Sequence, residues 1–231
     1  MMINKLSNRN DVDFENGSVV LIDKIKGKTS FDAVYKVRKA VKVKKVGHAG
    51  TLDPEATGLL IICTGKKTKE ISSFQNLTKT YTGTFKLGYV TKSFDSETEP
   101  VFCADCSNLE LSKIEEVRKL FLGKIKQFPP MYSAVKFNGK ALYKYARKGV
   151  DIERKEREIE IYKFDLNINL PFIHFEVNCS KGTYIRVLAS DFGEKLGCGG
   201  YLLELRRTAI GEYKVDDAFT LDEFYNFVKN N

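Results

Sequence analysis

The stretch GHAGTLDPEATG, residues 47–58, says most about how this 231-residue chain folds. It lies within a longer segment, residues 42–58, whose apolar residues follow neither the helical nor the strand period. Asp53 followed by Pro54 is typical of a helix start, with the aspartate as N-cap and the proline at the first helical position. An aspartate is also ionised at neutral pH and needs little activation to act as a nucleophile. From this stretch alone, Asp53 is either a structural cap or a reactive group.

Regular elements flank this loop on both sides. Ser30 is predicted to cap a helix that extends to Val41, because apolar residues recur there at helical spacing. Residues 59–64 are predicted to form an apolar strand. A long loop that is anchored at both ends inside a compact domain usually has a function. We therefore expect residues 42–58 to carry chemistry.

The rest of the chain changes repeatedly between strand and helix patterns. Strands are predicted at residues 18–23, 80–90, 158–169, 172–179 and 202–209, and helices at 112–123, 141–148, 183–196 and after residue 220. Capping boxes at residues 112–115 and 220–223 mark two helix starts. Because no strict βαβ rhythm is present, the predicted fold class is α+β, with a central mixed sheet flanked by helices. Residues 1–17 are predicted to be a loose N-terminal segment, and residues 18–231 a single domain.

Composition excludes several classes of protein. The chain is 42% hydrophobic, as globular proteins are, and its longest apolar run, residues 59–63, is too short to cross a bilayer. Its polar N-terminus lacks the apolar stretch of a signal peptide, so a cytoplasmic location is expected. Five cysteines, an odd number, argue against a disulfide framework. Cys103 and Cys106 have the spacing of half a zinc site, but no second pair accompanies them, so we expect no metal or cofactor.

Positive charge is concentrated in one part of the chain. The net charge is +8, and residues 124–157 contain ten Lys or Arg against three acids. Phe and Tyr residues are interleaved with these cations, as in surfaces that bind nucleic acid. On charge alone, a solvated charged face explains the cluster equally well.

Several separate segments, in the same order along the chain, resemble the TruB family of pseudouridine synthases. The matching segments are residues 23–30, 47–60, 79–81, 129–136, 179–186 and 205–211. The resemblance implies a pseudouridine-synthase fold and isomerisation of the uridine at tRNA position 55, in the T loop, to pseudouridine. It implies neither a cofactor nor a metal. Because a uridine in a folded loop is inaccessible, the enzyme would flip it out of its stack.

The resemblance also implies roles for individual residues. Asp53 would attack the target nucleotide covalently, at C6 of the uracil or C1′ of the ribose, and the two routes stay open. Arg186 would pair with Asp53 and keep its carboxylate ionised. Tyr81 would stack on the flipped uracil and help to move a proton. The substrate pocket would be completed by His48, Tyr184, Leu205 and Lys24.

The resemblance identifies the basic stretch as an insertion, about residues 124–157, that grips the T stem-loop. The cations expected to contact the RNA backbone are Lys136, Lys140, Lys144, Arg147 and Lys148. Ile25 stands where the family usually has a proline, and we expect no C-terminal PUA domain of the kind that many relatives carry. We expect a monomer with no obligatory protein partner. The alternatives are an RNA-binding or tRNA-folding protein without catalysis, and a guide-RNA-dependent synthase of the dyskerin type.

Overall fold

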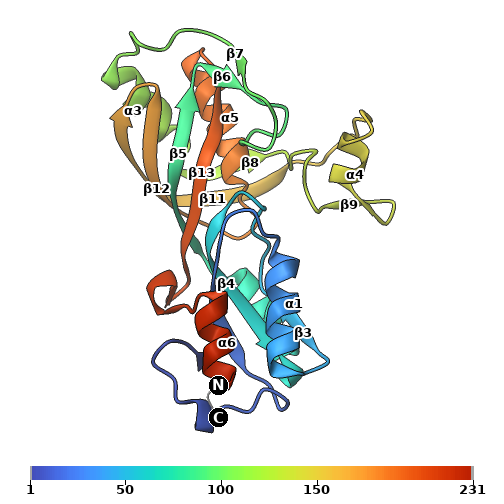
Figure 1. The fold of residues 1–231 in the computed structure, drawn as a ribbon. Coiled ribbons are helices and arrows are strands. Elements are labelled where there is room, and N and C mark those ends of the chain that lie inside the picture. The colour runs from blue at the N-terminus through green and yellow to red at the C-terminus, as the bar shows by residue number, and fades with distance from the viewer. Residues whose placement is uncertain (1, 230–231) are drawn as a thin grey trace. The chain divides into compact units, whose positions relative to one another are not determined.

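A computed structural model describes residues 2–229 (Figure 1). The chain divides into two compact units. The first unit comprises Met1–Thr82 and Leu205–Asn231, and the second comprises Gly83–Glu204. Both boundaries fall inside strands, β5 (Lys79–Leu87) and β13 (Gly200–Ile210), which explains why no linker composition marks them.

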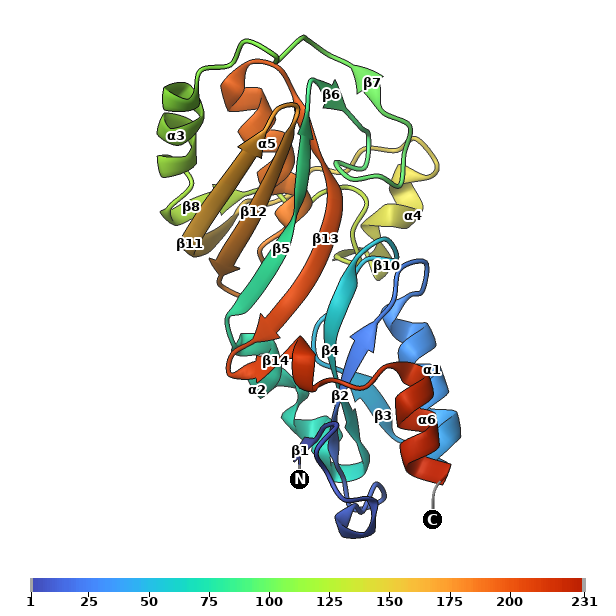
Figure 2. The ribbon, with the colours of Figure 1, turned by 60° about the vertical axis from the view of Figure 1, so that its left-hand side comes forward.

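The first unit is a mixed sheet with helices on it. Its other elements are β1 (Met2–Ile3), β2 (Val19–Lys24), α1 (Ser30–Val41), β3 (Val46–His48), β4 (Thr57–Thr64), α2 (Ile71–Asn76), β14 (Tyr213–Lys214) and α6 (Leu221–Lys229). The strand order is β1-β2-β4-β13, with β3 paired to β4 and β14 to β13. Strand β2 runs antiparallel to β4, whereas β13 runs parallel to it. Helices α1 and α6 lie side by side against this sheet (Figures 1 and 2).

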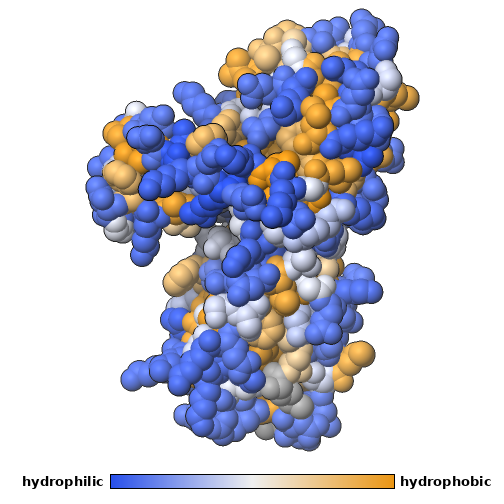
Figure 3. Space-filling model, turned by 180° about the vertical axis from the view of Figure 1, so that it is seen from behind, coloured by the Kyte–Doolittle hydropathy of each residue, from blue (hydrophilic) through white to orange (hydrophobic). Residues whose placement is uncertain are grey.

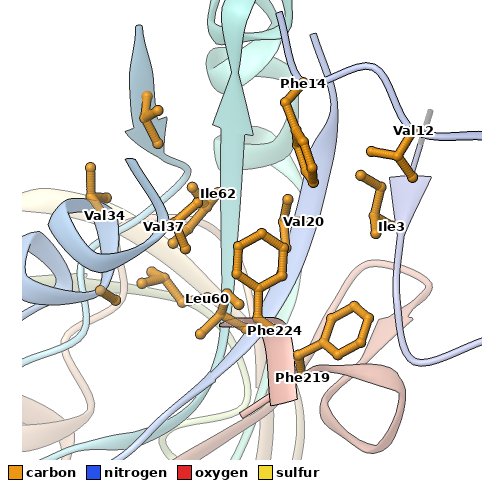
Figure 4. Close-up of a cluster of buried hydrophobic side chains, with 13 residues drawn as sticks. Ile3, Val12, Phe14, Val20, Val34, Val37, Leu60, Ile62, Phe219 and Phe224 are labelled. Carbon is orange, nitrogen blue, oxygen red and sulfur yellow. The ribbon is translucent and has the colours of Figure 1, made fainter. Parts of the chain in front are cut away.

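The N-terminal segment is packed, so the prediction of a loose residues 1–17 is wrong for the described part. Strand β1 pairs in parallel with β2, placing Ile3 opposite Val20. Ile3, Val12 and Phe14 are buried in the same cluster as Val20 and Phe224 (Figure 4). These apolar residues lie too far apart in the sequence to give a periodic pattern, which is why the pattern did not predict their burial.

Helix α1 begins as predicted but has a different cap. Thr29 is the N-cap, and its side chain and that of Asp32 form a reciprocal capping box. Ser30, the predicted cap, is instead buried within the first turn. By contrast, the predicted capping box of α6 is confirmed, because Thr220 and Glu223 exchange both hydrogen bonds.

The second unit contains an antiparallel sheet whose strand order is β13-β5-β12-β11-β8. Its other elements are β6 (Tyr89–Val90), β7 (Val101–Phe102), α3 (Leu111–Lys119), β8 (Gly123–Gln127), β9 (Lys136–Phe137), β10 (Lys140–Ala141), α4 (Leu142–Ala146), β11 (Arg157–Asn169), β12 (Phe172–Cys179) and α5 (Ile185–Leu196). A group of aromatic rings, Phe85, Phe164, Phe175 and Phe192, fills the core between the sheet and α5.

In this unit, the predicted end of one helix is confirmed and the predicted capping box of another does not form. Helix α5 ends at Gly197, whose φ of 82° is the left-handed conformation predicted for a glycine cap. Helix α3 begins at Leu111 after Glu110, and no capping box forms, because Glu115 bonds to Arg118 one turn later. Within residues 2–229 no helix is both long and apolar enough to cross a membrane. The surface seen in Figure 3 is mostly hydrophilic, with scattered hydrophobic side chains.

Candidate active site

Asp53 lies in a tight turn between β3 and β4 and not at the start of a helix. The backbone N–H of Ala56 donates to the carbonyl of Asp53 at 3.1 Å, which closes a turn with Pro54 at its second position. No helix follows, so the interpretation of Asp53 as a helix cap is wrong. The proline still explains the local geometry, because its fixed φ suits that position of a turn.

A buried arginine holds this loop from beneath. Arg207 is 1% exposed, and its guanidinium donates to the carbonyls of Leu59 at 2.7 Å and Gly50 at 3.1 Å. A longer contact, 3.4 Å, reaches the carbonyl of Thr51. The planar guanidinium donates several hydrogen bonds at fixed angles, so one side chain fixes both sides of the loop. In the sequence, Arg207 was distinguished only as a member of the matching segment 205–211.

Gly58 allows β4 to approach Arg207 closely. Its φ is 105°, and a Cβ atom there would lie 2.3 Å from the carbonyl oxygen of Arg207. Only glycine fits both the conformation and the space. This close approach places the Arg207 backbone directly beside the end of the Asp53 loop.

Ser30 fixes the residue before Asp53. Its hydroxyl accepts from the backbone N–H of Leu52 at 2.9 Å and donates to the carbonyl of Leu52 at 3.1 Å. Both groups are buried, so the pair is shielded from competing water. Helix α1 and the Asp53 loop are therefore tied together by this hydroxyl.

Lys24 lies beneath the same loop, fully buried. Its ammonium donates to the carbonyls of Lys28 at 2.7 Å, Ile25 at 3.0 Å and Pro54 at 3.3 Å. Burial lowers the pKa of Lys24 to about 8, while the nearby carboxylate of Asp53 acts in the opposite direction. All three N–H bonds go to backbone carbonyls, so Lys24 positions the loop and favours an ionised Asp53.

The lowered pKa of Lys24 predicts a pH dependence of stability. Between pH 8 and 10.5 the unfolded chain holds the Lys24 proton but the folded chain has released it. Below pH 8 the folded protein therefore bears the full free-energy cost of burying the charge of Lys24. As the pH rises, Lys24 loses its proton in the folded state and this cost disappears. Relative to Lys24→Met, the free energy of unfolding of the unaltered protein should rise by about 3 kcal/mol across this window. Urea denaturation of both proteins measures it, and a constant difference would contradict the assignment.

His48 ends β3, opposite Ile62 of β4. Burial lowers the pKa of His48; a backbone hydrogen bond with Gly50 opposes this shift and the positive charge of Arg207 adds to it, so the neutral form of the ring is favoured. Its Nδ1 atom is buried without a hydrogen-bond partner among residues 2–229. A neutral imidazole with an unused nitrogen can accept or donate one hydrogen bond to a ligand.

Two further predicted residues belong to the first unit. Tyr81 lies in β5 and is 9% exposed, and Leu205 lies at the boundary in β13 and is half-buried. Thr57, at the start of β4, donates its hydroxyl to the Leu205 carbonyl at 3.4 Å. Asp53, Lys24, His48, Tyr81 and Leu205 are therefore all contributed by one unit.

Arg186 and Tyr184 belong to the second unit. Arg186 lies in the first turn of α5, is 4% exposed, and forms an ion pair with Asp95 at 3.0 Å. Tyr184 precedes α5, and its backbone is held by Gln127, whose side chain accepts from its N–H at 3.0 Å and donates to its carbonyl at 3.3 Å. Because Asp53 and Arg186 lie in different units, their pairing stays a prediction.

Asp95 was not found by sequence analysis. It lies in residues 91–100, where no helix or strand was predicted, yet it is only 6% exposed. One carboxylate oxygen accepts from Arg186 and the other from the backbone N–H of Glu97 at 3.0 Å. No local pattern identifies a buried acid in such a loop, because its partner is 91 positions away.

The isosteric change Asp95→Asn removes one charge of this pair. We expect the free energy of unfolding to fall by about 2 kcal/mol, because a buried ion pair loses one member. We also expect catalysis to fall about tenfold at a temperature where the protein is folded, because Arg186 loses an orienting contact. Urea denaturation and single-turnover assays measure the two effects. Unchanged values for both would show that Asp95 does not position Arg186.

The predicted RNA-gripping cations are exposed around β9, β10 and α4. They are Lys136, Lys140, Lys144, Arg147 and Lys148. Lys140 lies 5.6 Å from the ring centre of Tyr145, and Arg147 lies 5.4 Å from that of Tyr143. Arg147 also pairs with Glu97 at 3.3 Å. These contacts hold rings and cations together on one exposed surface of the second unit.

The described residues offer no ready site for a metal. No group of three or more His, Cys, Asp or Glu side chains among residues 2–229 is arranged to hold an ion. All five cysteines are free thiols.

The sequence of the chain is similar to those of known proteins. Residues 38–185 match the N-terminal domain of TruB family pseudouridylate synthases, and residues 186–231 match the C-terminal domain of tRNA pseudouridylate synthase B. The tRNA pseudouridine synthase B of Chloroherpeton thalassium is 51% identical over 90% of this chain and 89% of its own length. That of Parabacteroides distasonis is 45% identical over 95% of this chain and 97% of its own length.

Solved structures show the same fold. A chain in the crystal structure of a Cbf5–Nop10–Gar1 complex has a TM-score of 0.72 at 27% identity, covering 100% of this chain and 62% of that one. A chain of an H/ACA RNP bound to a substrate RNA containing 2′-deoxyuridine has a TM-score of 0.68 at 26% identity, covering 92% and 53%. This chain thus spans less than two thirds of either.

The fold and these similarities define a pseudouridine synthase, and the predicted fold class is confirmed. The chain belongs to the TruB family of pseudouridylate synthases, as its matching segments predicted.

Proposed function

We propose that this protein isomerises the uridine at position 55 in the T loop of tRNA to pseudouridine, with Asp53 as its nucleophile. The observation that carries the proposal is the Asp53 loop, held by Arg207, Ser30 and Lys24 in a member of the TruB family. Three buried groups that fix one short turn are typical of a catalytic residue that must be positioned accurately.

The proposed reaction starts with attack by the carboxylate of Asp53. Attack at C1′ would displace the uracil from the ribose directly, whereas attack at C6 would form an adduct from which the glycosidic bond breaks. In either case the base rotates and C5 bonds to C1′; C5 then loses its proton, N1 gains one, and the carboxylate of Asp53 is released as the ester or adduct resolves. No atom is gained or lost, so the reaction needs no cofactor. Lys24 supports it by keeping the carboxylate ionised before the attack.

The remaining predicted residues complete the site in this proposal. Tyr81 stacks on the extruded uracil and moves a proton, Tyr184 and Leu205 enclose the base, and His48 offers its free nitrogen. In this proposal Arg186, which is held by Asp95, is the partner of the Asp53 carboxylate. The exposed cations of residues 136–148 bind the backbone of the stem-loop.

The proposed form of the enzyme is a monomer that acts on tRNA in the cytoplasm. It requires no protein partner, because the groups assigned to catalysis and to RNA contact all come from this chain.

The direct test is mass-spectrometric mapping of pseudouridine in an unmodified tRNA transcript treated with the purified protein. We expect one pseudouridine per tRNA, at position 55. Modification elsewhere would overturn the substrate assignment. Absence of any pseudouridine would favour an RNA-binding or tRNA-folding protein without catalysis.

The similarity to a chain of a Cbf5–Nop10–Gar1 complex raises a second candidate, a synthase that needs a guide RNA and partner proteins. The two candidates differ in what they need. Activity of the purified chain on a bare T stem-loop hairpin would exclude the guide-dependent mechanism. Activity that appears only with added guide RNA would exclude the proposal above.

A further inference from the structure

Residues 24–45, which include α1, carry as much net charge as the whole chain. They contain nine Lys or Arg residues and one acid, Asp32, so their net charge is +8, and that of the chain is also +8. Sequence analysis assigned the basic surface to residues 124–157 alone. Residues 24–45 lie in the first unit, together with Asp53, whereas residues 124–157 lie in the second.

Six of the lysines in this stretch are exposed and have no acidic partner among the described residues, whereas Lys24 is buried and Lys26 pairs with Glu55. The exposed lysines for which the described part of the chain provides no ion pair are Lys28, Lys36, Lys39, Lys42, Lys44 and Lys45. In residues 124–157, by contrast, Lys124, Lys126, Arg147 and Arg154 each pair with an acid. The positive potential is therefore less neutralised along α1 than along the insertion.

Two large rings stand among these lysines. Phe31 is 71% exposed and Tyr35, one turn later, is 62% exposed. The opposite face of α1, with Val34 and Val37, is buried in the core, so the helix does not need these rings for packing (Figure 4). On a charged face that only contacts water, exposed aromatic rings contribute nothing. A surface that binds nucleic acid, by contrast, contacts phosphates with its cations and stacks its rings on bases.

Helix α1 is joined directly to the Asp53 loop. Ser30, its first residue, bonds both backbone groups of Leu52, and the N–H of Gly27 donates to the carbonyl of Pro54 at 2.9 Å. A helix of 12 residues is about 18 Å long. RNA whose uridine reaches Asp53 therefore has further nucleotides within one helix length of the lysines.

We propose that the exposed face of α1, formed by Phe31, Tyr35, Lys36, Lys39 and Lys42, binds the sugar–phosphate backbone of the tRNA within one helix length of the target uridine. The identity of the RNA rests on the proposed function. This α1 face is a second RNA-binding surface, contributed by the unit that carries Asp53 and distinct from the insertion. Its occupant is RNA, because exposed rings beside unpaired cations match bases beside phosphates.

The test compares two triple variants that remove the same charge. The first, Lys36→Gln with Lys39→Gln and Lys42→Gln, alters the α1 face. The matched control changes Lys69, Lys119 and Lys195, which are exposed elsewhere and form no ion pair among the described residues. Affinity for whole tRNA is measured at several salt concentrations. The α1 triple should bind about 10- to 100-fold more weakly, and its salt slope should fall by about 2 to 3. The control should change little.

A double variant separates the rings from the charges. Phe31→Ala with Tyr35→Ala should weaken binding by about fivefold or more while leaving the salt slope unchanged. Both residues are exposed, so thermal unfolding should be nearly unaffected. Repeating the measurements with a T stem-loop hairpin locates the contact. Loss on both RNAs places it on the T arm, and loss on whole tRNA alone places it on another arm.

Two results would overturn the proposal: unchanged affinity and slope in the α1 triple, or equal weakening in the control triple. Unchanged affinity and salt slope would instead favour an acidic protein or an anionic membrane as the partner of this face. The binding assays do not depend on catalysis. A wild type that binds through α1 but forms no pseudouridine would therefore contradict the proposed function and leave this inference standing.

Discussion

Replacing Asp53 with asparagine should abolish pseudouridine formation while the protein stays folded and still binds tRNA. An amide of the same shape is not a nucleophile, and loss of a covalent nucleophile lowers turnover by at least about 10⁴-fold. The turn survives, because the N–H of Ala56 donates to the backbone carbonyl of Asp53, which asparagine retains. Tritium release from the C5 position of labelled tRNA measures the rate, and filter binding measures the affinity.

Glu55→Gln is the matched control for Asp53→Asn. Glu55 lies two residues away in the same turn and pairs with Lys26 at 3.3 Å at the surface. Losing an exposed pair costs at most about 1 kcal/mol, so its activity should stay close to that of the wild type. If Asp53→Asn retained substantial activity, or Glu55→Gln lost it, Asp53 would not be the nucleophile.

Arg207→Met should cause the largest loss of stability among the changes considered, together with a loss of catalysis. The carbonyls of Gly50, Thr51 and Leu59 would lose their donor inside the protein. Unsatisfied buried polar groups of this number cost about 3 to 5 kcal/mol in the free energy of unfolding. At a temperature where the variant is folded, turnover should fall about 100-fold, because the Asp53 loop loses its alignment.

Its neighbour Arg206 provides the matched control. Arg206 pairs with Asp23 at 2.7 Å, but its side chain is 41% exposed. Arg206→Met should cost about 1 kcal/mol or less, because a partly exposed pair contributes little. Urea denaturation and single-turnover kinetics on both variants measure the contrast. Equal effects of the two substitutions would show that Arg207 does not hold the loop. Arg207→Lys should be more stable than Arg207→Met. It should not recover full activity, because a lysine cannot donate to both sides of the loop as the planar guanidinium does.

Elements with a strong local signal were predicted well from sequence. The strand at residues 172–179 has the predicted bounds, and Gly197 ends α5 in the left-handed conformation. Such features depend on periodicity and on which residues accept positive φ, and both can be read in a short window. The sequence could not show which of two adjacent hydroxyls, Thr29 or Ser30, caps α1.

The supports of the candidate site were not predictable in this way. Arg207 contacts Leu59 across 148 positions, and Asp95 contacts Arg186 across 91. Two arginines adjacent in sequence, Arg206 and Arg207, have opposite environments, because strand neighbours face opposite sides of a sheet. Residue type and spacing pointed to Asp53, but the groups that hold it are brought together only by the tertiary fold.

The discontinuous first unit has a consequence for synthesis on the ribosome. The Asp53 loop is complete early in translation, yet the arginine that bonds to Gly50 is added 157 positions later, after the whole second unit. A nascent chain, or one truncated before Arg207, therefore has the nucleophile without its main support. In such a chain the reactive carboxylate is present but unaligned, so catalytic competence arrives only near the end of translation.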